Sequence, residues 1–268
     1  MRRWQLVALT ALVVLVGGGS LAWRWQQRGP GRPSVSGAIS RFRGSSSGAG
    51  GSASLQPPSG VYVYDASGSE SLSFMGTRQA QGPTDPGTIV LRPGGCWQFR
   101  IDFNSFHRQT WNRCAKGPKL LESGGTTDQR FDFGAFGRSE HTEVKCVPSI
   151  VVADLAARAG TESPIRCSGR SRATKTTVEQ TGVATFVGRD TLVVGGVRIA
   201  ALHTRQDMHL SGGQTGAVHV DIWFASTTGL PLKEVHTIRV VSPAPAPLNH
   251  VTYTERGSWR LTSLTPRR

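Results

Sequence analysis

The segment CWQFRIDFNSFHRQTWNRC, residues 96–114, alternates apolar and polar side chains on both sides of a short polar centre. A period of two is typical of strands that pack one face against a core. If residues 104–106 form the loop, Phe99 lies opposite Trp111 and Cys96 lies opposite Cys114. The segment therefore predicts an antiparallel hairpin, and its core face carries Trp97, Phe99, Ile101, Phe103 and Trp111.

The four cysteines are expected to be structural. The hairpin brings Cys96 and Cys114 together at its open end, which leaves Cys146 and Cys167 for a second disulfide. Four cysteines allow three pairings, and sequence alone does not choose among them. A zinc site is the competing interpretation, but the spacings contain no Cys-x-x-Cys pair. Disulfides persist in oxidising compartments, so they predict a body outside the cytosol.

Strand patterns continue on both sides of this hairpin, in short runs rich in Val, Thr, Phe and Trp. Gly195-Gly196 predicts a two-residue turn between residues 191–194 and 197–200. Residues 218–224 are expected to turn back into residues 230–241. Repeated crossover helices, which a parallel sheet would need, have no counterpart in the sequence pattern. The predicted fold is mainly β, with a curved antiparallel sheet.

One short helix is expected in this body, at Ile150–Ala159. Ser149 can cap its first turn, Gly160 can end it, and the apolar residues of the segment recur on one face at helical spacing.

The chain begins with an apolar segment. Trp4 to Trp23 contains no charged residue, follows Arg2 and Arg3, and is long enough as a helix to span a bilayer core. Residues 1–28 are therefore interpreted as a transmembrane signal anchor, in a single-pass arrangement with the C-terminal domain outside. A cleaved signal peptide is the alternative, with cleavage near Ala22 and a secreted product.

Residues 29–59 are rich in Gly, Ser and Pro and contain no acidic residue. Such a composition predicts a disordered linker between the membrane and a disulfide-bonded β domain at residues 60–268. The linker and the anchor together hold seven arginines, so they account for half of the net charge of +14. The remaining basic residues are scattered without interleaved aromatics, which argues against nucleic-acid binding.

The sequence contains no recognisable catalytic constellation or cofactor motif. Nucleophile-elbow, phosphate-loop and dinucleotide patterns are missing. His203, His209, His219, His236 and His250 show no ligand spacing and are interpreted as surface histidines. No cofactor, metal site or catalytic residue is expected, and the protein is expected not to be an enzyme. A secreted hydrolase with paired carboxylates is the third interpretation, since a fold can unite distant acids.

The stretch DIWFASTTGLPLK, residues 221–233, resembles a strand–turn–strand signature of the LolA-like superfamily, which includes lipoprotein carriers and envelope-stress regulators. The similarity extends over residues 191–241 and implies a half-barrel that binds a lipid or another apolar group. The two expected disulfides depart from the carriers. The whole chain also resembles uncharacterised membrane-anchored proteins of actinobacteria, through its arginine content, its linker, Cys96-Trp97 and Gly229-Leu230-Pro231.

These observations favour a non-enzymatic, membrane-tethered envelope domain that binds or senses a lipid or other apolar ligand. The candidate lining residues are Trp223, Phe224, Leu230 and Leu232. The alternative is a module that binds a protein partner in the envelope without a small-molecule ligand.

Overall fold

The computed structural model describes residues 30–45, 55–73, 76–132, 137–172, 175–244 and 249–268. The predicted anchor at residues 1–28 lies outside these ranges. Within them, no helix combines the length and the apolar character needed to cross a bilayer. The elements are α2 (Val35–Arg43), β1 (Gly60–Leu72), β2 (Arg78–Gln81), β3 (Thr84–Arg92), β4 (Cys96–Asp102), β5 (His107–Lys116), β6 (Lys119–Asp132), β7 (Gly137–Asp154), β8 (Thr161–Ser171), β9 (Thr177–Val194), β10 (Val197–Gly212), β11 (Thr215–Ala225), β12 (Pro231–Pro243) and β13 (His250–Leu261).

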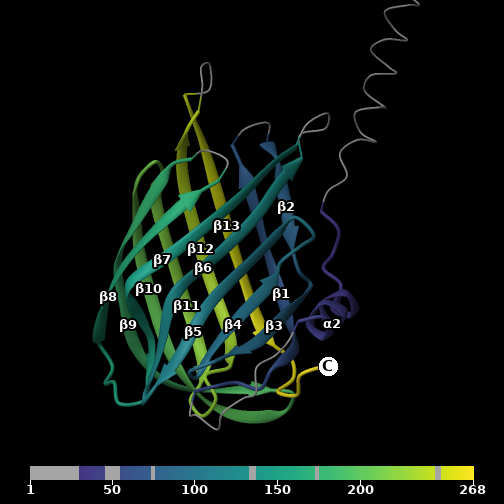
Figure 1. Ribbon diagram of the computed structural model, residues 1–268, viewed down its shortest axis with the longest axis vertical. Coiled ribbons are helices and arrows are strands. Elements are labelled where there is room, and N and C mark those ends of the chain that lie inside the picture. The colour runs from purple at the N-terminus through teal and green to yellow at the C-terminus, as the bar shows by residue number, and fades with distance from the viewer. Residues whose placement is uncertain (1–29, 46–54, 74–75, 133–136, 173–174, 245–248) are drawn as a thin grey trace, which may run out of the picture.

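The strands form an antiparallel meander that closes on itself (Figure 1). From β3 to β13, each strand pairs with the next one along the chain, and β1 pairs with both β3 and β13. Closure therefore produces a 12-stranded barrel. The short β2 pairs with residues 68–71 of β1, beyond the stretch at residues 60–65 that pairs with β3. The expected antiparallel sheet is confirmed. The expected half-barrel is wrong, because the sheet closes into a complete barrel. Pairing of residues 64–72 with residues 253–261 closes the sheet.

The hairpin at residues 96–114 has the predicted register, with Phe99 opposite Trp111 and Cys96 opposite Cys114. Both predicted disulfides form, Cys96–Cys114 and Cys146–Cys167. The apolar residues Trp97, Phe99 and Ile101 of β4 are almost completely buried, as their alternation predicts. They pack inside the barrel with Tyr64 and Trp259, whose rings lie 4.9 Å apart, centroid to centroid.

The two hairpins predicted nearer the C-terminus are also present. Residues 191–194 pair with residues 197–200 around Gly195-Gly196, and both glycines have the positive φ that this turn requires. Strand β11 then pairs with β12 after the turn at Gly229. A Cβ at Gly229 would lie 2.5 Å from the carbonyl oxygen of Leu55, so the packed turn admits only glycine there.

The prediction of a helix at Ile150–Ala159 is wrong. Strand β7 runs through Asp154, and Val151 and Ala153 pair with Leu121 and Leu120 of β6. The β-branched residues of this segment fit a strand at least as well as a helix, and pairing with β6 buries Ile150 and Val152 inside the barrel.

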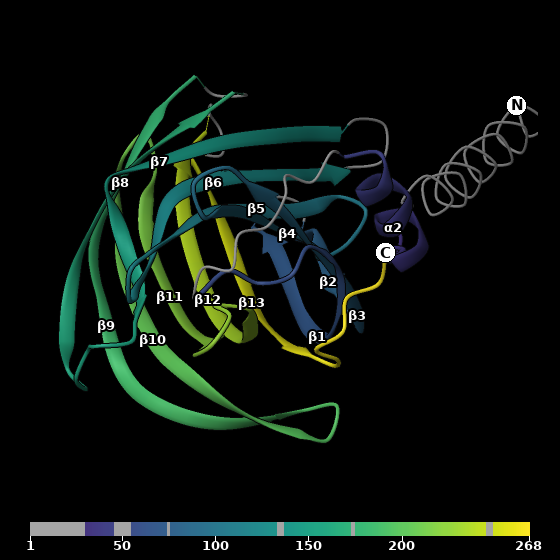
Figure 2. The same ribbon diagram turned by 60° about the horizontal axis from the view of Figure 1, so that its bottom comes forward.

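The described helix instead lies within the expected linker. Ser34 caps α2 by accepting a hydrogen bond from the Gly37 amide. Ala38 and Phe42, one turn apart, pack against Val61 and Val90 on the outer face of the barrel. Residues 35–43 are therefore part of the folded domain, in contrast to the expected disordered linker (Figure 2).

Candidate functional sites

The four predicted lining residues lie close together along the chain but do not converge on a cavity. Phe224, Leu230 and Leu232 are buried in the barrel core. Trp223 stacks on His203 with ring centroids 4.0 Å apart, and its indole nitrogen donates to Asp190 at 2.6 Å. None of the four lines either of the two pockets described below. As ligand contacts, they remain a prediction.

The barrel wall has a gap between β7 and β8. These strands pair only from residues 142–146 to residues 167–171. Beyond the Cys146–Cys167 disulfide the two strands diverge, although β7 stays paired with β6 and β8 stays paired with β9. Pro148 and Pro164 lie on the two diverging stretches, where their missing amide hydrogens cost no ladder bond. The disulfide therefore marks one end of the gap.

The turn between β7 and β8 marks the other end. The Gly160 amide donates to the Phe186 carbonyl, and the Arg189 guanidinium donates to the Leu155 carbonyl at 2.5 Å. These contacts attach the turn to β9 rather than closing β7 onto β8.

A pocket of about 160 Å³ lies in this gap. Its inner wall is apolar and includes Ala153, Ala184 and Phe186, all buried. The Thr204 hydroxyl lies in the same wall, is buried, and has no hydrogen-bond partner among the described residues. Lys119 and Asp154 line the pocket as well, with the Lys119 ammonium 3.9 Å from the Asp154 carboxylate. The gap thus combines an apolar inner wall with a polar part of the lining that also includes Thr161, Glu162 and Ser163.

Elsewhere in the barrel interior, acids and histidines form a buried cluster. Glu70 on β1, His107 on β5 and Glu255 on β13 bring one ligand atom each to within 4.8 Å of one another. The Nδ1 atom of His107 lies 3.2 Å from Glu70 Oε2 and 3.8 Å from Glu255 Oε1. All three residues are at most 3% exposed.

A second histidine extends this cluster along β12. His236 Nδ1 lies 3.0 Å from Glu234, and His236 Nε2 lies 3.2 Å from Glu255 Oε1. The Tyr253 hydroxyl lies 2.5 Å from Glu255 Oε2 and 3.0 Å from Glu70 Oε2. Gln81 donates to Glu255 Oε1 at 2.5 Å, Asn104 donates to Glu70 Oε1 at 3.2 Å, and Gln129 donates to Glu70 Oε2.

The cluster shifts the protonation of its members. Burial alone lowers the pKa of His236, but hydrogen bonds and charge from Glu234 and Glu255 outweigh burial and raise the pKa to about 10. Burial raises the pKa of Glu255, whereas His107, His236 and Tyr253 together lower it to about 2. The interior therefore favours ionised carboxylates beside cationic partners.

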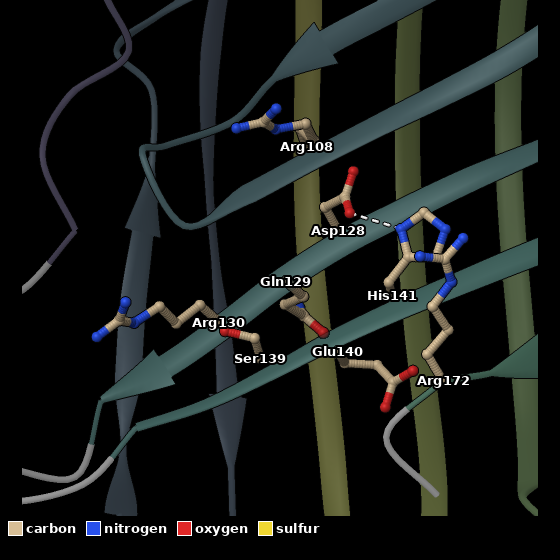
Figure 3. A pocket seen from close by; sticks show the side chains of 8 residues that line it. All are labelled: Arg108, Asp128, Gln129, Arg130, Ser139, Glu140, His141 and Arg172. Carbon is tan, nitrogen blue, oxygen red and sulfur yellow. Dashed lines mark hydrogen bonds and ion pairs between the residues drawn. The ribbon is translucent and has the colours of Figure 1, made fainter. Parts of the chain in front are cut away.

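A basic pocket lies on the outer face of β5, β6 and β7 (Figure 3). Its volume is about 440 Å³. Arg108, Asp128 and His141 lie opposite one another in register across the three strands, and His141 Nδ1 lies 2.7 Å from Asp128. The remaining lining residues are Gln129, Arg130, Ser139, Glu140 and Arg172. Within the described ranges, Arg108 and Arg172 form no ion pair.

Sequence reasoning missed the interior cluster. The interpretation of His236 as a surface residue is wrong, because it is 5% exposed and bonded at both nitrogens. Alternation could have placed His107 inside, since it shares the face of Trp111. Glu70 and Glu255 gave no local signal, because only closure of β1 onto β13 places them together.

Comparison with models of known protein families gives no match for this chain, and comparison with curated proteins gives none either. Among solved structures, the hypothetical lipoprotein YmcC from Escherichia coli is similar, with a TM-score of 0.29 and 13% sequence identity. The similarity covers 82% of this chain and 95% of that protein. The LolA-like and actinobacterial resemblances continue to rest on their sequence landmarks.

Proposed function

We propose that this protein is a non-enzymatic, membrane-tethered domain of the cell envelope that binds the apolar chain of an amphiphile, such as a fatty acid, in the gap between β7 and β8. The single observation that supports this proposal most strongly is the pocket with an apolar inner wall, in a stretch of the barrel where the two strands do not pair. The two disulfides fit a location outside the cytosol.

The dimensions of the pocket favour the end of a chain rather than a whole lipid. Apolar cavities of about 150 Å³ stay dry and accept groups of the size of benzene. The gap opens the pocket sideways, so the rest of an amphiphile remains outside the wall. Lys119 is half-exposed at this pocket, where its ammonium can pair with a carboxylate headgroup.

Native mass spectrometry tests the proposal on the full chain, released from its host membranes in a mild detergent. Ala184 is 2% exposed and lines the pocket, so Ala184→Leu places an isobutyl group where the ligand would lie. We expect co-purifying amphiphile on the wild type and at least tenfold less on Ala184→Leu. Ala80→Leu is the matched control, because Ala80 is exposed on β2, away from the gap.

A second variant distinguishes binding of the ligand's apolar chain from binding of its headgroup. Lys119→Gln is expected to weaken uptake of an added fluorescent fatty acid several-fold and to leave uptake of the matching fatty alcohol unchanged. Ligand-free wild type that takes up neither probe would contradict the proposal. Equal uptake by the wild type and Ala184→Leu would also contradict it.

A second candidate function is recognition of an acidic protein partner, favoured by the basic pocket on β5–β7. Its volume lies within the range of about 300–1,000 Å³ that ligand sites occupy, and the guanidinium groups of Arg108 and Arg172 are not engaged by acids of the described chain. Arg108→Glu is expected to abolish capture of an acidic envelope partner while fatty-acid uptake is retained. Capture that survives this charge reversal would remove the candidate.

A further inference from the structure

We propose that Glu70, His107 and Glu255 bind a divalent transition-metal ion, with zinc as the tested ion, inside the barrel. This site is separate from the gap between β7 and β8, so it does not depend on the proposed function. It also differs from the sequence-based expectation that the chain has no metal site.

Charge is the first argument for a bound cation. Glu70 and Glu255 are directly opposite each other in the pairing of β1 with β13. Two like charges at such a position destabilise a sheet, and more strongly when both are buried. Glu234 adds a third buried carboxylate through His236. Even if His107 and His236 both carry a proton, these five residues keep one net negative charge.

Geometry is the second argument. The Nδ1 atom of His107 is buried and aimed at Glu70 and Glu255, yet it has no hydrogen-bond partner among the described residues. A tetrahedral ion with bonds of about 2.0–2.1 Å separates its ligand atoms by roughly 3.3 Å. The separation of 3.2 Å from His107 Nδ1 to Glu70 Oε2 is close to this spacing, and the 3.8 Å to Glu255 Oε1 is about 0.5 Å longer, so a bound ion would draw the Glu255 carboxylate inward.

His236 provides a contrast within the same cluster. Both of its ring nitrogens lie within hydrogen-bond distance of carboxylates, 3.0 Å from Glu234 and 3.2 Å from Glu255. His236 is therefore engaged at both ring nitrogens, whereas His107 Nδ1 faces the carboxylates of Glu70 and Glu255, so an ion bound among these three residues would replace a proton on this nitrogen. An imidazole ligand favours zinc and similar metals over Mg²⁺ and Ca²⁺, which prefer oxygen ligands.

The groups behind the carboxylates act as positioning residues. Asn104 and Gln129 donate to Glu70, and Gln81 and Tyr253 hold Glu255. Such outer hydrogen bonds fix the orientation of ligating carboxylates in metal sites. The cluster therefore holds two oriented carboxylate oxygens and the Nδ1 atom of His107 within 4.8 Å of one another.

The test uses the full chain, purified without metal-affinity resin. The protein is unfolded in urea with its disulfides intact, refolded with excess Zn²⁺, passed through a desalting column, and assayed for metal by mass spectrometry. We expect about one zinc ion per wild-type chain. Glu70→Gln and His107→Asn are expected to retain at least tenfold less.

His141→Asn is the matched control, since His141 pairs with Asp128 on the outer face and lies outside the cluster. It is expected to retain zinc like the wild type. A wild type that retains less than a tenth of an equivalent would overturn the proposal. Equal zinc content in the wild type and both cluster variants would overturn it as adventitious binding.

A measurement on the wild type alone keeps the test valid if the variants do not fold. Zn²⁺ is expected to raise the thermal unfolding midpoint of the refolded wild type by several degrees, and Mg²⁺ at the same concentration is expected to leave it unchanged. Co²⁺ in place of Zn²⁺ should give the visible absorption of a tetrahedral site. Equal responses to Zn²⁺ and Mg²⁺, without that absorption, would refute the site.

Discussion

At the scale of single residues, Arg113 is an arginine placed within the aromatic core. It is 2% exposed, and its Nε donates to Glu122 at 2.9 Å. Its guanidinium lies 4.9 Å from the ring centroid of Phe224 and 5.5 Å from that of Trp97. The cation is therefore held by one carboxylate and by the faces of aromatic rings.

Removing only the carboxylate of this pair is expected to be costly. Glu122→Gln leaves the guanidinium buried without its counter-charge, and this loss should lower the free energy of unfolding by about 3–5 kcal/mol. The double variant Arg113→Met/Glu122→Leu removes both charges and should cost less than the single change. Urea unfolding of the full chain measures both. A double variant less stable than Glu122→Gln would contradict this account.

Asp85 provides a pH-dependent test. It is completely buried, and neither of its carboxylate oxygens accepts a side-chain hydrogen bond within the described ranges. Burial, aided by the charge of Asp102, raises the pKa of Asp85 to about 8. The folded chain therefore holds a proton between about pH 4 and pH 8 that the unfolded chain releases.

The sign of the effect follows from this difference. Stability falls as pH rises through that window, by about 1.4 kcal/mol per pH unit from this group. Asp85→Asn removes the titration, so its stability relative to the wild type should increase steadily from pH 5 to pH 8. Urea unfolding at several pH values tests this, and parallel profiles for the two proteins would argue against a raised pKa.

Residue-level alternation explains how much of the interior could be predicted. It placed the apolar residues of β4 correctly, and the same rule puts Arg113 on the face of Trp111. It does not indicate partners across the barrel. Arg113 meets Phe224 and His107 meets Glu70 only because distant strands close around a common interior.

At the scale of elements, the two disulfides close loops of similar length but differ in their position relative to the gap between β7 and β8. Cys96–Cys114 closes a separation of 18 residues, and Cys146–Cys167 closes one of 21. Chain entropy predicts that each contributes about 3 kcal/mol to stability. Only Cys146–Cys167 lies where the pairing of β7 with β8 stops.

Replacing both cysteines of one disulfide by alanine, in two separate variants, should therefore distinguish an effect on stability from an effect on ligand binding. Both variants are expected to lose about 3 kcal/mol of unfolding free energy. Only Cys146→Ala/Cys167→Ala is expected to change fatty-acid uptake, because only that disulfide limits the length of the gap. Equal uptake by the two variants would show that the gap is not the binding site.

Short elements were predicted less well than hairpins. The turn at Gly195-Gly196 is specified locally, so its strands could be predicted. Residues 150–154 fit both a helical face and a strand, and pairing with β6 decides between them. Helix α2 forms in a Gly/Ser-rich stretch because Ala38 and Phe42 find Val61 and Val90, a contact that composition does not reveal.

At the scale of the whole molecule, the disulfides indicate an oxidising compartment. Alkylation of the full chain in host membranes tests this directly. The four cysteines are expected to react with a mass-tagged maleimide only after denaturation and reduction. Labelling of denatured, unreduced protein at all four positions would place the body in a reducing compartment.

Closure of the barrel explains why neither the interior cluster nor the gap between β7 and β8 could be predicted from the sequence. Glu70 and Glu255 are separated by 185 positions in the chain but directly paired in the sheet. The gap between β7 and β8 is likewise a stretch in which two neighbouring strands do not pair, and a local pattern does not reveal it, although Pro148 and Pro164 lie there. Both sites are properties of the complete ring of strands.

Photo-crosslinking in host membranes tests the central claim, binding at the gap, most directly. A diazirine fatty acid is supplied, and labelled peptides of the full chain are mapped after illumination. Labels are expected within residues 151–164 and 184–204, in the wild type and in Ala80→Leu, with at least tenfold less in Ala184→Leu. Labels confined to residues 4–23, or an equal yield in Ala184→Leu, would contradict the claim.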